Sequence, residues 1–81
     1  MAKVLLFGPL RDVAGWRERE LDPPPASIAA LKRSLGLEDP QLAEALAGPG
    51  VQVALDQQIV RGDRPLSAAS EVAFLSPMSG G

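Results

Sequence analysis

Short apolar runs of strand length are separated along the chain by glycine, proline and charged residues. Lys3–Phe7 is a mainly apolar run that stops at Gly8-Pro9, a pattern typical of a strand buried on both faces. Residues 10–15 predict a turn or a single helical turn that ends at a glycine. Residues 16–21 alternate arginine with glutamate between apolar ends, which predicts an exposed edge strand in a hairpin with the first run.

Two helical patterns follow a run of three prolines. The first has an apolar stripe at helical spacing, formed by Ile28, Leu31 and Leu35. Ser27 is a good N-cap for this main helix, and we expect Gly36 to be its stop. Asp39-Pro40 supplies a second cap and first helical position, which predicts a short second helix that ends before Gly48.

The remaining residues predict three further strands. Val51–Leu55 alternates as a strand does, residues 56–58 make a tight turn, and Ile59-Val60 form a short return strand. A loop and a turn over residues 61–70 lead to Glu71–Leu75, a mostly apolar last strand that we expect at the centre of the sheet.

Together these elements predict an α+β domain over residues 1–75. Its mixed sheet should have about five strands, with the main helix and the short second helix across one face. The first and last apolar runs are expected to be neighbours in the sheet. A flexible tail, residues 76–81, would then leave from the middle of the sheet.

The amino-acid composition limits the chemistry that the chain can perform alone. None of its 81 residues is Cys, His or Tyr, which removes thiolate nucleophiles, the usual general base near neutral pH and the commonest metal ligands. We therefore expect no metal site and no independent catalytic side chains. A formal net charge of −2 argues against nucleic-acid binding, which needs clustered Lys and Arg.

The distribution of apolar residues predicts a cytoplasmic protein. No apolar run approaches the ~20 residues that a membrane span needs. The first four residues lead directly into a strand-like run and lack the layout of a cleavable signal peptide. We expect no membrane association.

The sequence ends in an uncharged tail whose last two residues are Gly80 and Gly81. A carboxylate flanked by glycines has no neighbouring side chain and can enter a narrow slot. From residue 77 such a tail reaches at most about 13–14 Å, at ~3.3–3.6 Å per residue, which suits insertion into another protein's active site. The terminal carboxylate is therefore the leading candidate for a reacting group, although two terminal glycines also arise by chance or from an expression scar.

Three segments carry motifs of a known family. They are Lys3–Phe7 with Leu10-Arg11-Asp12 and Gly15, then Val53–Val60, and finally Pro65-Leu66 with Glu71–Leu75 and Gly80-Gly81. Over essentially the whole length, the chain resembles the MoaD family of molybdopterin synthase small subunits, which are ubiquitin-like β-grasp sulfur carriers. It departs from the family pattern at Asp56, where Asn is usual, and at Ala69-Ser70, where Gly-Asp is common.

The resemblance implies that the chain is a sulfur-bearing reagent and a non-catalytic subunit of a transferase complex. An E1-like enzyme would use ATP to adenylate the carboxylate of Gly81, with Gly80 giving narrow access, and a sulfur donor protein would convert the adenylate into a thiocarboxylate. The tail would then enter the large subunit of molybdopterin synthase, within a heterotetramer. There its sulfur would pass to cyclic pyranopterin monophosphate, to build the dithiolene that binds molybdenum or tungsten.

Docking of the folded body is expected to involve residues near the tail. The candidates are Phe7, Arg11, Ile59, Phe74, Leu75 and Met78. Core packing is the competing interpretation for the apolar ones, and it stays open for Phe7 and Phe74 because residues of a strand point alternately to the two faces. A surface contact is favoured for Ile59 and Met78. Arg11 either pairs with an acid of the partner or stays solvated.

Three other functions remain open from the sequence. The chain could carry sulfur for another pathway, such as thiamine synthesis or tRNA thiolation, although the thiamine carrier is typically shorter between Phe7 and Gly15. It could be a ubiquitin-like modifier that is conjugated to lysines through Gly81. It could also be a plain interaction module whose Gly-Gly ending has no chemical role.

Overall fold

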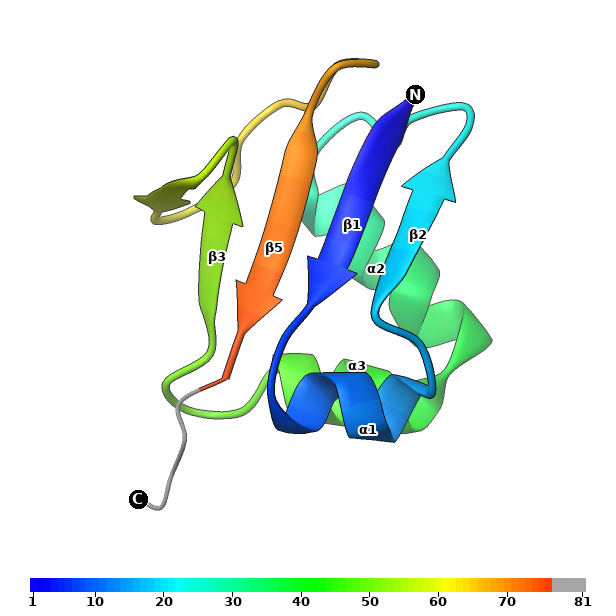
Figure 1. The fold of residues 1–81 in the computed structure, drawn as a ribbon, viewed down its shortest axis with the longest axis vertical. Helices are drawn as coiled ribbons and strands as arrows, with labels where there is room; N and C mark the ends of the chain where they lie inside the picture. The colour runs from blue at the N-terminus through cyan, green and yellow to red at the C-terminus, as the bar shows by residue number, and fades with distance from the viewer. Residues whose placement is uncertain (77–81) are drawn as a thin grey trace.

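The computed structural model describes residues 1–76, which form one mixed sheet with helices packed against it (Figure 1). In chain order the elements are β1 (Ala2–Leu6), α1 (Pro9–Ala14), β2 (Glu18–Leu21), α2 (Ile28–Glu38), α3 (Pro40–Leu46), β3 (Gln52–Leu55), β4 (Gln58–Val60) and β5 (Glu71–Leu75). The predicted strands and both predicted helices are present. Residues 10–14 form the greater part of the short helix α1, and Gly15 ends it in the left-handed conformation.

The five strands lie in the order β2-β1-β5-β3-β4. β1 and β5 are parallel, while β1–β2, β3–β5 and β3–β4 are antiparallel. The hairpin of β1 with β2, the edge position of β2 and the central position of β5 are therefore confirmed. Because β1 and β5 run in the same direction, the chain leaves β5 at the end of the sheet where α1 lies (Figure 1).

Both main helices begin where the sequence predicts. The Ser27 hydroxyl accepts the N–H of Ala30 at 3.2 Å, and Asp39 Oδ1 accepts the N–H groups of Gln41 and Leu42 at 3.1 and 3.2 Å. These side chains satisfy backbone donors that have no partner within the first turn of a helix. The two caps explain why α3 restarts only one residue after α2 ends.

The expectation that Gly36 ends the main helix is wrong, because α2 continues to Glu38. A Cβ placed on Gly36 would lie 2.9 Å from the Cβ of Ala43 in α3, closer than two carbon atoms pack. Glycine at this position therefore allows the two helices to approach each other. Glycine is common both at helix ends and where two helices pack closely. The sequence pattern favoured a helix end at Gly36, whereas the structure shows a close helix contact.

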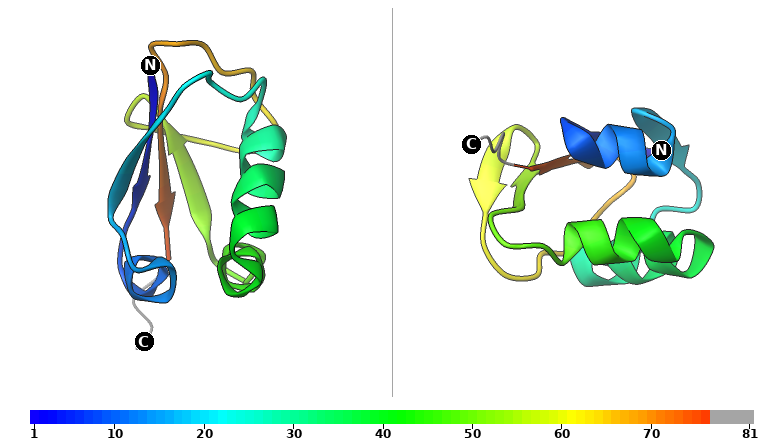
Figure 2. Two further views of the ribbon diagram at one scale, coloured as in Figure 1. Left: turned by 90° about the vertical axis from the view of Figure 1, so that its right-hand side faces the viewer. Right: turned by 90° about the horizontal axis from the view of Figure 1, so that it is seen from below.

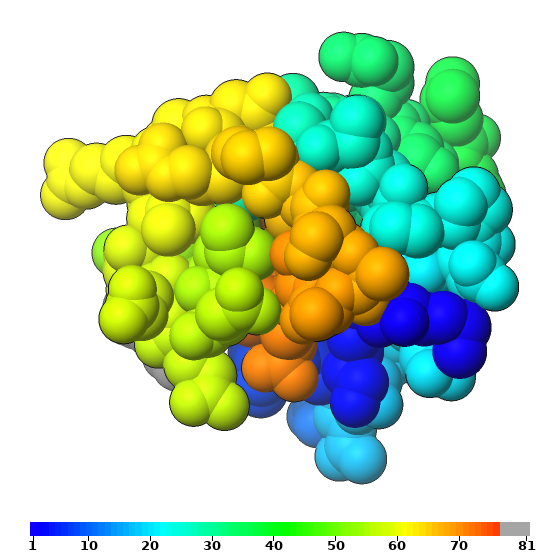
Figure 3. All heavy atoms as spheres, turned by 90° about the horizontal axis from the view of Figure 1, so that it is seen from above, coloured from blue at the N-terminus to red at the C-terminus, as the bar shows by residue number. Residues whose placement is uncertain are grey.

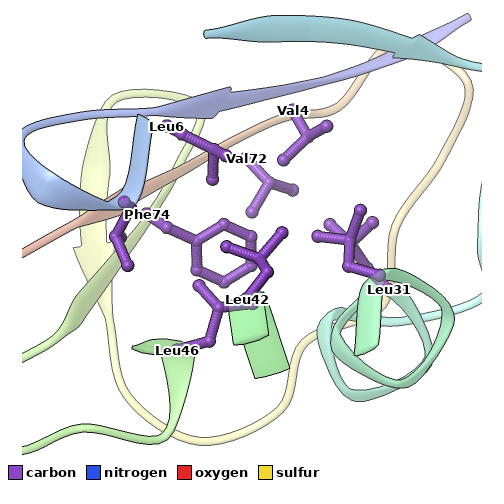
Figure 4. Close-up of a cluster of buried hydrophobic side chains, with 9 residues drawn as sticks. Val4, Leu6, Leu31, Leu42, Leu46, Val72 and Phe74 are labelled. Carbon is purple, nitrogen blue, oxygen red and sulfur yellow. The ribbon is translucent and has the colours of Figure 1, made fainter. Parts of the chain in front are cut away.

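The core lies between the sheet and the pair α2–α3 (Figure 2, left). Its largest fully buried side chain is Phe74, and Leu6, Val4 and Val72 point into the same layer from neighbouring strands (Figure 4). From the helices, Leu31, Leu42 and Leu46 close this layer on its other side (Figure 4). The strand that precedes the tail is thus anchored by the ring of Phe74.

β1 is not buried on both faces as the sequence pattern predicted. Its residues alternate between buried positions (Ala2, Val4 and Leu6) and half-buried ones (Lys3 and Leu5). Among residues 1–76, α2 and α3 cover one face of the sheet, α1 lies at the end of the sheet, and the other face carries no helix (Figure 2). The apolar run therefore includes side chains that the domain's own core does not cover.

The end of the domain away from α1 is closed by the connection from β4 to β5. This segment crosses the top of the molecule, and the start of β1 emerges beside it (Figure 3). The N–H of Lys3 donates to the carbonyl of Ser70 at 3.0 Å, and Ser70 Oγ accepts the N–H of Ser67 at 2.9 Å. Within the described part of the chain, no helix is long and apolar enough to span a membrane.

Candidate functional site

The candidate site begins where the chain leaves the centre of the sheet. Leu75 is the last residue of β5, and the described chain ends at Ser76. The tail residues singled out from the sequence, Met78, Gly80 and Gly81, lie outside the described residues. The site that the structure describes is therefore the base of the tail and the sheet surface around it.

The base of the tail is held by the segment that follows β1. The N–H of Phe7 donates to the carbonyl of Phe74 at 3.1 Å, which extends the β1–β5 pairing beyond the last residue of β1. A Cβ on Gly8 would meet the carbonyl oxygen of Ser76 at 3.6 Å. Gly8 has φ 62° and ψ −141°, a conformation that is essentially restricted to glycine. This glycine turns the chain into α1 directly beside the exit of the tail.

The other end of β5 is also fixed to its neighbours. The N–H of Asp56 donates to the carbonyl of Glu71 at 2.8 Å, and the N–H of Glu71 donates to Asp56 Oδ1 at 2.9 Å. Asp56 and Gln57 both have positive φ, 51° and 71°, as the tight turn of a two-residue hairpin requires. The hairpin therefore accommodates Asp at position 56, where the resembled family usually has Asn. Asp tolerates the positive φ, and its carboxylate accepts a hydrogen bond from the first residue of β5.

The uncovered face of the sheet carries an apolar row that crosses four strands. The pairing places Leu5 opposite Ala73, Ala73 opposite Ala54, and Ala54 opposite Ile59. Directly paired residues point to the same face, so these four side chains, here called the outer row, lie side by side. Ala54 is buried at 8% exposure, Leu5 and Ala73 are half-buried, and Ile59 is 54% exposed.

Two further apolar residues flank the outer row on the side of the tail. Leu75 is half-buried and pairs with Gln52 on the same face. Phe7 follows β1 and is 44% exposed. Both lie at the end of the sheet where β5 releases the chain, so the apolar part of the uncovered face adjoins the base of the tail.

The opposite end of this face is charged. Lys3 lies between Glu20 and Glu71 in the strand pairing, and its Nζ is 3.3 Å from Glu18 Oε2. The side chains of Lys3 and Glu18 are 40% and 49% exposed, and an ion pair in contact with solvent contributes little to stability. The uncovered face therefore changes from charged, at the start of β1, to apolar beside the tail.

The structure separates the sequence-predicted docking residues into three groups. Phe7, Ile59 and Leu75 lie on or beside the uncovered face. Phe74 is fully buried in the core, so its proposed partner contact is a wrong expectation, because alternation along β5 points its ring toward the helices. Arg11 is exposed on α1 and lines a hollow of about 460 Å³ with Asp12, Gly15, Trp16 and Arg17.

Three members of the outer row, Leu5, Ala54 and Ala73, were missed from the sequence. For Leu5 and Ala73 the signal is present in the apolar runs of β1 and β5, where the side chains that alternate with the buried ones are apolar after a charged first member, Lys3 or Glu71. Such runs indicate a strand covered on both faces. When the domain covers only one face, the second apolar set indicates a surface available to another protein.

Comparison with known proteins adds independent observations. The model of the ThiS family matches residues 4–81 of the chain. The molybdopterin synthase sulfur carrier subunit of Escherichia coli (strain K12) is 32% identical over 81 residues, which are 100% of both chains. SAMP1 from Haloferax volcanii has a similar structure, with a TM-score of 0.84, 24% identity and coverage of 99% of this chain and 98% of that one. The small archaeal modifier protein 1 of Methanosarcina acetivorans gives a TM-score of 0.80 at 23% identity, covering 99% and 95%.

These likenesses agree with the architecture. The five-stranded mixed sheet, with its parallel central pair and helices on one face, is a ubiquitin-like β-grasp fold. The family match includes nearly every residue of the chain and reaches the Gly-Gly ending. The chain belongs to the ThiS family.

Proposed function

We propose that the chain is the sulfur-carrier subunit of a molybdopterin synthase. The observation that carries the proposal is the 32% identity to the Escherichia coli sulfur carrier subunit over the whole of both chains. The geometry supports it, because a central, doubly paired strand leads to the Gly-Gly ending and an uncovered apolar face adjoins the exit. The domain supplies a rigid base and a docking surface for a reactive terminus.

The chemistry proposed for Gly81 follows from the properties of a carboxylate. An ionised carboxylate resists attack, and its oxygen is a poor leaving group. An activating enzyme joins a carboxylate oxygen to the α-phosphorus of ATP and releases pyrophosphate, which makes AMP the leaving group. A sulfide ion then attacks the carbonyl carbon, AMP departs, and loss of the proton leaves a thiocarboxylate. Where the sulfur donor protein offers a persulfide instead, the acyl disulfide that forms is cleaved by a second thiol of the donor, which releases the thiocarboxylate and leaves the donor as a disulfide. Glycine suits this step because no side chain shields the carbonyl carbon.

Sulfur transfer is proposed to occur inside the large subunit of molybdopterin synthase. The chain has no Cys, His or Tyr, so side chains that move protons during the transfer to the pterin precursor come from the partner. The thiocarboxylate sulfur attacks a precursor carbon, and an oxygen substituent leaves that carbon as water or as a phosphate-ester oxygen. Water then attacks the acyl carbon of the resulting thioester, which leaves the sulfur on the precursor as a thiolate and returns the carboxylate of Gly81. Two such transfers supply both sulfurs of the dithiolene.

The outer row has an energetic role in this proposal. Ordering four or five residues of a tail in a slot costs on the order of 5–10 kcal/mol. At about 25 cal/mol per Å² of apolar surface buried, about 200–400 Å² offsets that cost. This area is within the ~800 Å² per partner of a standard interface. Burial of the outer row with Phe7 and Leu75 against the large subunit would therefore hold the tail in place.

Conjugation to other proteins is the second candidate function. It is favoured by the structural likeness to the two archaeal proteins named as SAMP1, one of them described as a small archaeal modifier protein. The same activated carboxylate would then be attacked by a lysine amine, with AMP leaving and an isopeptide bond forming. Their identity to this chain is 24% and 23%, so the likeness supports the fold that both functions share.

Reconstitution separates the two functions. The chain is prepared as a C-terminal thiocarboxylate by cleavage of an intein fusion with ammonium sulfide, and is mixed with a molybdopterin synthase large subunit and cyclic pyranopterin monophosphate. We expect dithiolene formation, with none from the carboxylate form. Absence of product, while the Escherichia coli carrier subunit is active in the same mixture, would refute the proposal. Lysine-linked conjugates of the tagged chain in cell lysate would favour the modifier.

A further inference from the structure

A second surface lies on the side of the domain where the helices leave the edge of the sheet open. One hollow of about 380 Å³ runs between α2 and the β3–β4 hairpin, lined in part by Lys32, Val51, Val53, Val60 and Arg61. A second hollow of about 290 Å³ lies between α2 and α3, lined by Lys32, Arg33, Ala43, Leu46 and Ala47. Lys32 lines both, so the two hollows adjoin at this side chain, and together they are here called the edge groove.

The floor of the edge groove is apolar for a structural reason. Val53 and Val60 are paired across β3 and β4, and Val53 is also paired with the buried Phe74. Both valines therefore point to the helix side of the sheet, yet both remain half-buried. The helix pair does not extend over the edge strand, and this part of the inner face is left open.

Among the described residues that line the edge groove, all the charged ones are cationic. Lys32, Arg33 and Arg61 are exposed, and neither hollow has an acidic residue in its described lining. Among residues 1–76 the two ion pairs are Lys3–Glu18 and Arg19–Glu38, so none of the three cations has a carboxylate partner in that range. This concentration of cations contrasts with the chain's net charge of −2.

An apolar floor with a cationic rim is complementary to a peptide that combines apolar and acidic residues. β4 is the edge strand of the sheet, and it leaves one row of backbone N–H and C=O groups open to an added strand. An extended peptide along β4 would direct alternate side chains toward Val53 and Val60. Its acidic residues would meet Lys32, Arg33 and Arg61.

We propose that the edge groove binds an extended acidic and apolar segment of a partner protein. The groove opens on the helix side of the sheet, whereas the outer row lies on the other face, and Ile59 at the rim is the residue that both surfaces share. A partner in the groove leaves Leu5, Ala73, Phe7 and the base of the tail accessible. The site would allow one protein to hold the domain while its terminus is in another.

The test uses a fluorescein-labelled synthetic peptide of about ten residues that alternates Glu or Asp with Leu or Val. Fluorescence anisotropy gives its affinity for the full chain, and ¹H–¹⁵N spectra of the labelled chain locate it. We expect spectral changes at Lys32, Val53, Val60 and Arg61. Affinity should fall at least about tenfold in the Lys32→Glu/Arg61→Glu variant, and should weaken with added salt.

Matched controls make the outcome decisive. Arg17→Glu/Arg11→Glu changes the net charge equally but lies at the hollow beside α1, so it should retain affinity to within about twofold. A peptide with Lys replacing its acids should not bind. The proposal is overturned by equal losses in the two double variants, by spectral changes confined to the outer row, or by no binding at about 1 mM. Tighter binding of a single-stranded RNA oligonucleotide in the groove would overturn it as well.

Discussion

Replacing Gly36 with alanine tests whether one close contact sets the position of the helix pair under the sheet. The added methyl carbon would lie 2.9 Å from the Cβ of Ala43, whereas carbon atoms pack best at about 3.5–4.0 Å. Alanine at an exposed helix position would stabilise the fold by about 0.8–1.0 kcal/mol. Overpacking typically costs about 1–3 kcal/mol, so we expect Gly36→Ala to destabilise the domain by about 1 kcal/mol in total.

A double-mutant cycle isolates the contact. Ala43→Gly alone should cost about 1 kcal/mol of helix propensity. The double variant Gly36→Ala/Ala43→Gly moves the methyl group from position 43 to position 36 and keeps a single methyl group at the contact. The free energy of unfolding of the double variant should therefore lie within about 0.5 kcal/mol of that of the original chain. The coupling energy between the two positions is then about 2 kcal/mol.

The assay is urea unfolding followed by circular dichroism, with the free energy of unfolding obtained by linear extrapolation. The Gly36–Ala43 contact positions α3, whose Leu42 and Leu46 pack under Phe74 in the strand that carries the tail. The reasoning is refuted if Gly36→Ala is more stable than the original chain. Strict additivity of the two substitutions would refute it equally.

Three further predictions follow from the site and its supports. Ile59→Ser should weaken binding to the molybdopterin synthase large subunit by about 5–30-fold in a calorimetric titration, because burying a half-exposed Ile side chain in the complex contributes about 1–2 kcal/mol. Leu37→Ser, at an 82% exposed position on α2, is the control and should leave the affinity unchanged. Equal effects of the two substitutions would contradict the docking face. Gly8→Ala should cost on the order of 1–3 kcal/mol, seen as a lower Tm, and an unchanged Tm would contradict the assigned backbone. The N–H of Ala29, 2.8 Å from Asp63 Oδ1, holds the pKa of Asp63 below its ordinary value of 3.8. The ionised carboxylate therefore contributes stability that is fully present at pH values above 3.8 and is lost as the pH falls through the lower pKa of the folded state. Asp63→Asn should remove this part of the pH dependence of the urea unfolding midpoint. An unaltered pH dependence would contradict a stabilising bond to the Asp63 carboxylate.

The topology was accessible from the sequence because several local signals agree. The strand-length apolar runs, the Ser27 and Asp39 caps and the charged edge strand each predict the element that is observed. The placement of the last strand beside the first followed from their common apolar character. Each of these inferences uses a signal that lies within one short segment.

The errors concern contacts between segments. Gly36 was assigned as a stop because nothing local reveals that Ala43 packs against it. The sequence did not decide whether the ring of Phe74 lies in the core or on the surface. Alternation along a strand shows which residues share a face, but it does not show which face the helices cover. The same ambiguity concealed Leu5, Ala54 and Ala73 as members of the outer row. The three-dimensional arrangement resolves all of these by placing both helices on one face.

The central claim is that the carboxylate of Gly81 is the reacting group, and the mass of the intact chain tests it most directly. The chain is incubated with an E1-like activating enzyme, ATP and a sulfur donor, with the Escherichia coli carrier subunit as a positive control. The account predicts a mass increase equal to the exchange of one oxygen for sulfur, located in the C-terminal peptide and absent when ATP is omitted or Gly81 is deleted. An unchanged mass beside a reacting control, or the same increase without Gly81, would contradict it.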